Sequence, residues 1–341
     1  MSDSPAGALA PSAAVADRSP LLVVRRLRIH FERRDLAWWR RPVSVKAVDG
    51  IDFNLRPGET LGIVGESGCG KSTLARALVG LQPVTSGAIE FEGRDLSRLD
   101  EKAFRPLRRQ IQMIFQDPLA SLDPRMTIGE SIGEPLRALY PEIGKAEREA
   151  RVRQWLDKVG LSAMLADRYP HEFSGGQCQR VGIARALIVQ PRLLVCDEPV
   201  SALDVSVQAQ ILNLLADLQR ELDLALLFIA HDLSVVRHLS HRVMVMYLGK
   251  VMEQAETEVL FRQPMHPYTR ALMAAIPGFD PEQPPALLPG EPASPAQPPP
   301  GCVFVSRCPM ADHPCNRSVP HLKRVASGAH AACHYLGAVG A

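Results

Sequence analysis

The chain carries two patterns of alternating apolar and polar positions from about residue 21. LLVVRRLRIHF (21–31) and VKAVDGIDFNL (45–55) have the character of strands, and the polar insertion RRDLAWWRRP (33–42) separates them. These patterns predict two strands of an antiparallel sheet.

Short apolar runs then alternate with helical patterns. ETLGIVG (59–65), RLLVCDEP (192–199) and ALLFIAHD (225–232) have the length and apolar content of buried strands. KSTLARALVGL (71–81) and VQAQILNLLADLQREL (207–222) instead have the spacing of helices. Strands that alternate with helices predict an α/β fold with a mostly parallel sheet covered on both faces.

Two further regions differ from this alternation. Residues from about 118 to 169 are mainly helical in pattern, as in GESIGEPLRALY (129–140) and KAEREARVRQWLDKVG (145–160). After about residue 277, PEQPPALLPGEPASPAQPPPGC (281–302) is typical of an extended proline-rich linker, and a compact cysteine-bearing tail follows. No internal repeat is visible, so we expect one α/β unit per chain.

The composition adds limits to this organisation. The 341 residues are 46% hydrophobic and 22% charged, enough for one large domain with an appendage. The net charge of +2 is too small to indicate nucleic acid. No apolar run approaches the roughly 18–20 residues of a membrane span, and the Ala-, Pro- and Ser-rich start lacks a secretory signal. We expect a disordered tail at residues 1–20 and a cytosolic location.

The octapeptide GESGCGKS (65–72) matches the phosphate-loop pattern G-x-x-x-x-G-K-S/T, between a strand and a helix. Backbone N–H groups of such a loop wrap the phosphates, Lys71 reaches the β- and γ-oxygens, and Ser72 ligates Mg²⁺. A glycine-rich turn with a chance lysine is the alternative, and this context disfavours it. The predicted nucleotide-binding residues here are Gly65, Glu66, Ser67, Gly68, Cys69, Gly70, Lys71, Ser72 and Thr73.

Two carboxylates end the apolar run LLVCDEP. We expect Asp197 to hold Mg²⁺ and Glu198 to polarise the attacking water. General-base assistance of this kind contributes on the order of 10²- to 10⁴-fold. Alone, an Asp-Glu pair after a strand would more often be a solvated turn; beside a phosphate loop it predicts a catalytic site.

Two other polar residues follow apolar strands. His231, after ALLFIA, is a candidate hydrogen-bond partner of the γ-phosphate or the water, although a lone histidine there is more often structural. Gln116, in MIFQDP, offers an amide oxygen that would complete the Mg²⁺ shell and report on the γ-phosphate. Together the catalytic prediction comprises Lys71, Glu198 and His231, and the Mg²⁺ prediction comprises Ser72, Gln116 and Asp197.

A second phosphate-binding pattern lies in FSGGQCQR (173–180). A serine and two glycines precede the helical run VGIARALIV, which is how an anion site at a helix N-terminus is built. One nucleotide needs only one phosphate loop, so this second pattern requires its own explanation. The residues of this pattern are Ser174, Gly175, Gly176 and Gln177.

Taken together, the motifs resemble the ATP-binding cassette (ABC) family over roughly residues 21–261, and SALD (201–204) belongs to the set. The resemblance implies a RecA-like, mostly parallel sheet with helices, an antiparallel β-subdomain and a helical signature subdomain. In that family two cassettes pair head to tail, so Ser174 and Gly176 would cap the ATP of the other chain. Asp204 would carry contact between the two chains, and ATP and Mg²⁺ would be the ligands.

IFQDPLASLDPRMTIGE, HEFSGGQCQR, CDEPVSALDVSVQAQI and HPYTRALMAAIP are similar to ATPase subunits of oligopeptide and dipeptide importers, most of all to the second (F) ATPase subunits of oligopeptide permeases. The resemblance implies a second cassette chain, identical or different, two membrane permeases, an external peptide-binding protein acting indirectly, and no nucleic acid. It implies peripheral attachment to the cytoplasmic face of the inner membrane. Cargo stays open between oligopeptide, dipeptide, nickel or another solute.

The same resemblance sets the expected domain boundaries. They are a tail at 1–20, an ABC nucleotide-binding domain at 21–262 with its helical subdomain at about 118–180, and an oligopeptide-transporter-type C-terminal region at 263–341. The helices after Gln116 would face the permease and respond to loss of the γ-phosphate. Many cassettes of the family stack adenine on an aromatic residue; Pro42, Val43 and Ser44 occupy that place here, and Phe31, Trp38 and Trp39 are the candidate substitutes. The tryptophans equally fit packing in a loop or contact with lipid headgroups.

Four of the 7 cysteines form the pattern C-x5-C-x6-C-x17-C in the tail, and disulfides are not expected in a cytosolic chain. Four thiolates suit Zn²⁺ or an iron–sulfur cluster, but the spacing lacks the C-x2-C knuckles of zinc ribbons. The family resemblance favours a 4Fe-4S cluster over Zn²⁺ and over free thiols. The residues are Cys302, Cys308, Cys315 and Cys333.

Two other functional classes remain as alternatives. A soluble cassette protein of DNA repair or of ribosomes usually has two cassettes or a long coiled-coil insertion, and neither is visible. A non-hydrolysing binding module would usually have lost Lys71, Glu198 or the SGGQ pattern. The sequence therefore favours an ATPase that powers import.

Overall fold

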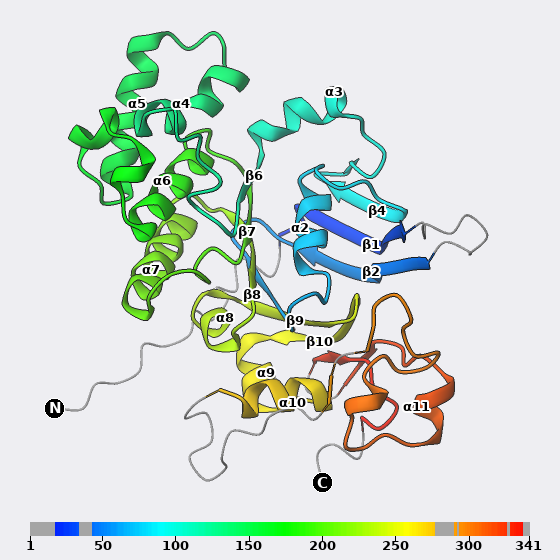
Figure 1. Cartoon of the computed structure of the whole chain (residues 1–341). Helices are drawn as coiled ribbons and strands as arrows, with labels where there is room; N and C mark the ends of the chain where they lie inside the picture. The colour runs from blue at the N-terminus through cyan, green and yellow to red at the C-terminus, as the bar shows by residue number, and fades with distance from the viewer. Residues whose placement is uncertain (1–17, 34–42, 277–289, 292, 326–327, 337–341) are drawn as a thin grey trace, which may run out of the picture.

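The computed structural model describes residues 18–33, 43–276, 290–291, 293–325 and 328–336. Residues 1–17 of the tail predicted at 1–20 lie outside these ranges. So do Trp38, Trp39 and Pro42 of the predicted adenine site, and residues 277–289 before and within the proline-rich linker. Within them, the strands form two sheets, of order β2-β1-β4-β5 and β11-β12-β10-β9-β3-β8-β7-β6. Figure 1 shows the smaller sheet and the helical part of the chain on opposite sides of the larger sheet.

The strands are β1 (Leu22–Arg33), β2 (Val43–Leu55), β3 (Thr60–Val64), β4 (Ser86–Phe91), β5 (Arg94–Asp95), β6 (Ile111–Ile114), β7 (Leu193–Asp197), β8 (Ala225–Ala230), β9 (Arg242–Tyr247), β10 (Lys250–Glu256), β11 (Lys323–Arg324) and β12 (His330–Ala331). The α-helices are α2 (Lys71–Leu78), α3 (Glu101–Phe104), α4 (Ile128–Leu139), α5 (Lys145–Lys158), α6 (Gly175–Leu187), α7 (Val205–Glu221), α8 (Leu233–Leu239), α9 (Thr257–Arg262), α10 (Pro267–Ala274) and α11 (His313–Arg317). The 3₁₀ helices are η1 (Arg105–Arg109), η2 (Ala163–Asp167), η3 (Pro170–Glu172) and η4 (Val305–Arg307).

The larger sheet is buried on both faces. Its centre, from β9 through β3, β8 and β7 to β6, is parallel, and β10 joins β9 in the antiparallel direction. Ile63, Val195 and Leu227 point to one face and share a core with α2 and the smaller sheet. Leu194 and Phe228 point to the other face and pack with α6, α7 and α8. Burial on both faces explains why these strands are apolar runs without alternation.

The smaller sheet is antiparallel, as the alternating patterns predicted. β1 pairs with β2 and β4. Helix α2 packs against both β2 and β7, so it lies between the two sheets. The phosphate loop that precedes α2 is therefore held between two rigid layers.

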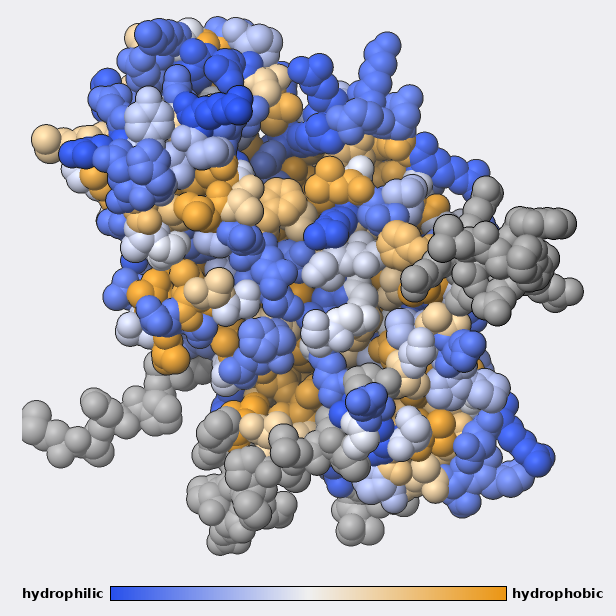
Figure 2. All heavy atoms as spheres, in the orientation of Figure 1, coloured by the Kyte–Doolittle hydropathy of each residue, from blue (hydrophilic) through white to orange (hydrophobic). Residues whose placement is uncertain are grey.

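The helical part of the chain contains α4, α5 and η2, which pack on one another and on α6. Thr127 caps α4 in a reciprocal arrangement: its side chain accepts from Glu130 N, and its own N–H donates to the Glu130 carboxylate. Hydrophilic residues cover most of the visible face of this part (Figure 2). Helices α4 and α5 each have a polar face that is not packed in the core, and this face is available for contact with another protein.

The observed fold confirms the predicted ABC class, with a mostly parallel sheet, an antiparallel subdomain and helices. Strands β4, β9 and β10 were not predicted, although the apolar run RVMVMY (242–247) carried a signal for β9. A separate cysteine-containing C-terminal domain stays a prediction, because β12 pairs with β10, and Cys302, Phe304 and Cys315 belong to the same core as α6 and α7. None of the helices in the described ranges has the length and apolar character needed to cross a bilayer.

Candidate nucleotide-binding site

The phosphate loop runs from the carboxyl end of β3 to the first residue of α2. Gly70 adopts φ +108°, and a Cβ atom there would lie 2.0 Å from the carbonyl oxygen of Ala47. Gly65 likewise has no room, since its Cβ would lie 2.2 Å from the carbonyl oxygen of Met246. Only glycine satisfies both the conformation and the close approach. β2 and β9 therefore shape the loop from outside.

Lys71 is buried at the start of α2. Its Nζ donates to the carbonyl oxygens of Gly65, at 2.7 Å, and Glu66, at 3.1 Å. Nζ also lies 3.7 Å from Oε1 of Glu198. The Lys71 ammonium group is thus bound by carbonyl oxygens of the phosphate loop and lies next to the predicted catalytic carboxylate of Glu198.

The predicted Mg²⁺ ligands Ser72 and Asp197 lie together. Ser72 Oγ donates to Asp197 Oδ1 at 2.9 Å, and Asp197 is only 3% exposed. Burial raises the pKa of Asp197, and the adjacent Glu198 carboxylate adds to that rise. A hydroxyl and a carboxylate oxygen in contact at a strand end fit a hard cation such as Mg²⁺.

Glu198 is the point where the predicted catalytic residues converge. The Gln116 side-chain amide donates to its Oε2 at 3.2 Å, and Nδ1 of His231 lies 3.7 Å from the same oxygen. Lys71 approaches the other oxygen. Glu198 has φ +48°, a left-handed conformation that is rare outside glycine and typical of functional sites.

The remaining loop residues have separate places. Ser67 and Gly68 are exposed at the crest of the loop, and Thr73 lies in the first turn of α2. Cys69 is 3% exposed, and burial raises the pKa of its thiol, so it is a small buried side chain.

The SGGQ residues do not join this site within the chain. Ser174 caps α6: its Oγ accepts from Gln177 N at 3.3 Å, and its N–H donates to Gln177 Oε1 at 3.0 Å. Ser174 and Gly175 are exposed, and the first N–H groups of a helix have no partner inside it. Gly176 must remain small, because a Cβ there would lie 2.5 Å from Val207. An exposed helix N-terminus of this build is available to a phosphate from outside the chain.

Asp204 also faces outward. It precedes α7, is exposed and makes no side-chain cap. The loop before it is fixed, because the Gln208 amide donates to the carbonyl oxygens of Val200 and Leu203, each at 2.9 Å. The Asp204 carboxylate is therefore held at the surface without capping its own helix, although the Asp204 carbonyl oxygen accepts from Gln208 N at 2.8 Å.

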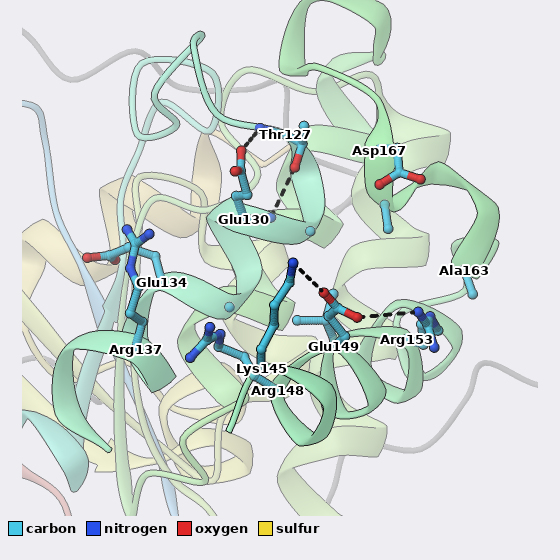
Figure 3. A pocket seen from close by; sticks show the side chains of 14 residues that line it. Thr127, Glu130, Glu134, Arg137, Lys145, Arg148, Glu149, Arg153, Ala163 and Asp167 are labelled. Carbon is cyan, nitrogen blue, oxygen red and sulfur yellow. Dashed lines mark hydrogen bonds and ion pairs between the residues drawn. The ribbon is translucent and has the colours of Figure 1, made fainter. Parts of the chain in front are cut away.

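A groove lies between α4, α5 and η2, with a cavity volume of about 360 Å³. Figure 3 shows charged side chains around it, with Lys145, Glu149 and Arg153 linked in a row. The Glu149 carboxylate lies 3.8 Å from the nitrogen of each neighbour. Arg137 and Glu134 are exposed on the α4 side. The groove is thus charged with both signs.

Two residues that contact the phosphate loop were not predicted. The Tyr268 hydroxyl accepts from Glu66 N at 3.0 Å, and Arg307 donates to the Glu66 carboxylate at 2.7 Å. Tyr268 belonged to the quoted string HPYTRALMAAIP, but that string gave no reason to place it at the loop. Nothing in the sequence near Arg307 indicated this contact.

The four tail cysteines gather in one region without forming a metal site. Cys302 N donates to Cys315 O at 2.8 Å. Burial raises the pKa of the Cys302 thiol to about 11, and Cys308, Cys315 and Cys333 act in the same direction. Among the residues that the structure describes, no group of three or more His, Cys, Asp or Glu side chains is arranged to hold a metal ion. The predicted cluster or Zn²⁺ therefore has no support in this geometry.

Comparisons with known proteins show the family. Residues 48–201 match the family model described as ABC transporter, and residues 252–315 match the oligopeptide/dipeptide transporter C-terminal region. The oligopeptide transport ATP-binding protein OppF of Escherichia coli is 54% identical over 318 residues, covering 92% of this chain and 95% of that protein. The oligopeptide transport ATP-binding protein AppF of Bacillus subtilis is 49% identical, covering 94% and 98%.

Solved structures show the same fold. The dimeric ATP-binding cassette MJ0796 bound to ADP and Pi has a TM-score of 0.62 at 28% identity, covering 69% of this chain and 98% of that one. The structure of cbiO1 from Clostridium perfringens, part of a cbiONQ transporter complex, has a TM-score of 0.61 at 29% identity, with coverage of 71% and 91%. The phosphate loop, the convergence on Glu198 and these similarities establish that the chain belongs to the ABC transporter family, as an ATPase of its oligopeptide transport branch.

Proposed function

We propose that this chain is an ATP-hydrolysing subunit that powers peptide import through a membrane complex. The observation that carries the proposal is the convergence of Lys71, Gln116 and His231 on Glu198, next to the Ser72–Asp197 pair. This chain aligns with nearly the whole length of relatives named as oligopeptide transport ATP-binding proteins. This similarity supports peptide as the cargo.

The roles of the site residues follow from their chemistry. The loop N–H groups and Lys71 bind the phosphates, and the Lys71 ammonium exchanges its loop carbonyl acceptors for phosphate oxygens. Ser72, Asp197 and Gln116 would hold Mg²⁺, which supplies positive charge at the phosphates when it is bound. Glu198 accepts the proton of the attacking water, and His231 hydrogen-bonds the γ-phosphate or that water.

A second cassette completes the site in this proposal. Ser174 and Gly176 lie at the N-terminus of α6, where Ser174 is exposed, and Asp204 at the N-terminus of α7 is also exposed. We propose that two cassettes, identical or different, pair head to tail, with each SGGQ closing on the ATP of its partner. Closure on ATP and opening after hydrolysis supply the mechanical step.

The groove between α4, α5 and η2 is the proposed docking site of a membrane permease. Its mixed charges suit a polar cytoplasmic segment better than an apolar one. The segment after Gln116 leads directly into α4, so a change at the γ-phosphate can reach the groove. Docking there places the chain peripherally at the cytoplasmic face of the inner membrane, with the external binding protein acting only through the permeases.

The test is purification from membranes followed by peptide uptake in reconstituted vesicles. Two permeases, a second cassette and ATP-dependent uptake of peptide are expected with the unaltered chain. Arg137→Glu, which reverses a groove charge, is expected to lose the permeases, whereas Arg220→Glu on α7 is expected to keep them. Co-purification with ribosomes or DNA in place of permeases would favour the soluble cassette class. Uptake of nickel or dipeptides alone would contradict oligopeptide as the cargo but not the proposed ATPase function.

We also propose, from the resemblance of the tail, that the four cysteines take up iron as a 4Fe-4S cluster, with Zn²⁺ as the alternative. Their gathering around Cys302 supports this, but their arrangement is not that of a metal site, so uptake requires the sulfurs to approach one another. An ultraviolet–visible spectrum and elemental analysis of anaerobically purified protein test it. Absence of both iron and zinc leaves the residues as free thiols.

A further inference from the structure

The phosphate loop is held by two side chains from the far end of the sequence. Arg307, in η4, donates to Oε2 of Glu66 at 2.7 Å, across 241 residues of chain. Tyr268, in α10, accepts the backbone N–H of Glu66 at 3.0 Å, across 202 residues. Glu66 is the second residue of the loop. Both contacts therefore act on the segment where β3 turns into the phosphate-binding backbone.

Both side chains are fixed by burial. Tyr268 is 0% exposed and Arg307 is 6% exposed. The Tyr268 ring lies 4.8 Å from the Tyr247 ring and 5.3 Å from the Phe304 ring, between centroids. The Arg307 guanidinium carbon lies 6.0 Å from the centroid of the Tyr247 ring. The aromatic cluster of Tyr247, Tyr268 and Phe304 thus joins β9, α10 and the C-terminal segment into one support.

Glu66 connects these two side chains to Lys71, the lysine that is proposed to bind phosphate. Its carbonyl oxygen accepts from Lys71 Nζ at 3.1 Å and from Cys69 N at 3.3 Å. Its N–H and its carboxylate are taken by Tyr268 and Arg307. A shift of Glu66 therefore moves an acceptor of Lys71 and the first turn of the loop together.

A buried ion pair contributes little to the free energy of unfolding, because the cost of desolvating the charges offsets most of their attraction. Its strength lies in fixing geometry, and here it fixes a ligand-binding loop. We propose that Arg307 and Tyr268 are positioning residues that hold the phosphate loop through Glu66 and thereby set its affinity for ATP. The proposal rests on the proposed ATPase function and adds the C-terminal region to the nucleotide site.

The experiment measures steady-state ATP hydrolysis by the complete complex with Arg307→Gln. We expect KM for ATP to rise about tenfold while kcat changes less than about twofold, the loss expected for a charged hydrogen bond that orders the free loop. Arg307→Lys should recover part of the affinity, because an ammonium group also donates to a carboxylate and keeps the positive charge beside Glu66. Tyr268→Phe keeps the ring but removes the acceptor of Glu66 N, and should raise KM in the same direction.

A matched control separates positioning from stability. Arg242 pairs with Glu59 at 2.9 Å in another buried contact, at the opposite end of β3. Arg242→Gln should lower the melting temperature at least as much as Arg307→Gln and leave KM for ATP unchanged. A double-mutant cycle of Arg307→Gln with Glu66→Gln should be non-additive in KM.

Unchanged KM in both Arg307→Gln and Tyr268→Phe overturns the proposal, as does an equal rise in Arg242→Gln. Additive effects of the Arg307 and Glu66 substitutions also overturn it. A failure of the proposed ATPase function is distinguishable, because the unaltered complex would then show no hydrolysis at all.

Discussion

At the scale of single residues, Glu198, the proposed catalytic base, has a strained backbone with φ +48°. A left-handed conformation costs a residue with a side chain about 1–2 kcal/mol. Two bonds stabilise it: Glu198 N donates to Ile229 O at 3.0 Å, and Glu198 O accepts from Ser201 Oγ at 3.0 Å. The conformation turns the chain sharply after β7, which brings the carboxylate to Lys71 and Gln116. We infer that the strain serves to aim this side chain.

The residue-scale prediction concerns the Glu198→Gln variant. The amide keeps the size of the side chain but cannot accept a proton, so turnover should fall by at least about 10²-fold. ATP should remain bound, because Lys71 and the loop are unchanged. Single-turnover hydrolysis and retention of labelled ATP after gel filtration measure the two effects.

Glu221→Gln is the control, since this carboxylate is exposed on α7 and pairs only with Lys158 in the described contacts. It should hydrolyse ATP at the normal rate. Undiminished hydrolysis by Glu198→Gln would mean that another group is the base.

Much of the site could be predicted at this scale. Asp197, Glu198, Gln116 and His231 each follow an apolar strand, and the carboxyl ends of parallel strands meet at one edge of a sheet. The predicted neighbours do meet there. Arg307 could not be predicted in the same way, because its contact with Glu66 depends on tertiary packing and leaves no periodic trace in the sequence.

At the scale of elements, the N-terminal cap of α10 contains a titratable side chain, His266. His266 Nδ1 accepts from Tyr268 N at 3.0 Å, and the Glu253 carboxylate on β10 accepts the backbone N–H groups of Met265 and His266. Phe304 packs on the imidazole at 5.8 Å between ring centroids. This cap holds α10 where Tyr268 reaches the phosphate loop, so its protonation state affects the fold next to the site.

The pH prediction follows from the pKa of His266. Burial lowers this pKa from 6.5 to about 4. Between these values the unfolded chain binds a proton that the folded chain does not, so the free energy of unfolding decreases as pH falls. The contribution is up to about 3 kcal/mol over this window. Urea unfolding at several pH values measures it.

His266→Asn keeps a cap acceptor but removes the titrating group, so its stability should depend less steeply on pH between 6.5 and 4. His321→Asn, at an exposed position, should keep the steepness of the unaltered chain. Identical pH dependence in all three proteins would show that His266 does not contribute.

The segment between β6 and α4 links the nucleotide site to the groove. Gln116 touches Glu198, and the Asp117 carboxylate accepts from Leu119 N at 3.0 Å and Ala120 N at 2.9 Å, which stiffens the turn. Arg185 on α6 donates to Ser121 O at 2.6 Å. This contact connects the segment after Gln116 to α6, the helix that Ser174 caps.

Gln116→Ala tests this link. ATP binding should stay within about twofold, and peptide transport should fall about tenfold, more than hydrolysis does, because the coupling between sites is lost. Gln112→Ala, on the same strand but away from Glu198, should leave the ratio of transport to hydrolysis unchanged. Equal losses of transport and hydrolysis in Gln116→Ala would contradict a coupling role.

At the scale of the whole molecule, the C-terminal region is where the sequence was least informative. The pairing of β12 with β10 and the cluster of Tyr247, Tyr268 and Phe304 join residues that are far apart in the chain. Single-sequence patterns report local period and motif, so they identified the cassette but not the packing of the tail against it. The arrangement of the four thiols depends on that same packing.

At the scale of the whole chain, the phosphate loop and the SGGQ pattern, the second predicted phosphate-binding element, lie apart. One lies between the two sheets at α2, and the other opens α6 at the surface of the helical part (Figure 1). If the exposed SGGQ pattern is half of a site, as proposed, a partner chain would be needed to complete that site. The separation of these two elements in one folded chain favours a site shared between chains more directly than either motif does alone.

Ser174→Arg tests the shared site. Ser174 lies outside the phosphate loop of its own chain, so binding of ATP to the isolated chain should stay within about twofold of normal. Turnover of the assembled complex should fall about 10²-fold, because a bulky side chain at the N-terminus of α6 blocks the donors that would face the partner's phosphate. Ser162→Arg is the matched control: Ser162 is also an exposed capping serine of the helical part, at the start of η2, and its loss should leave turnover nearly normal. Full turnover in Ser174→Arg, or full turnover by a strict monomer, would show that one chain hydrolyses ATP alone.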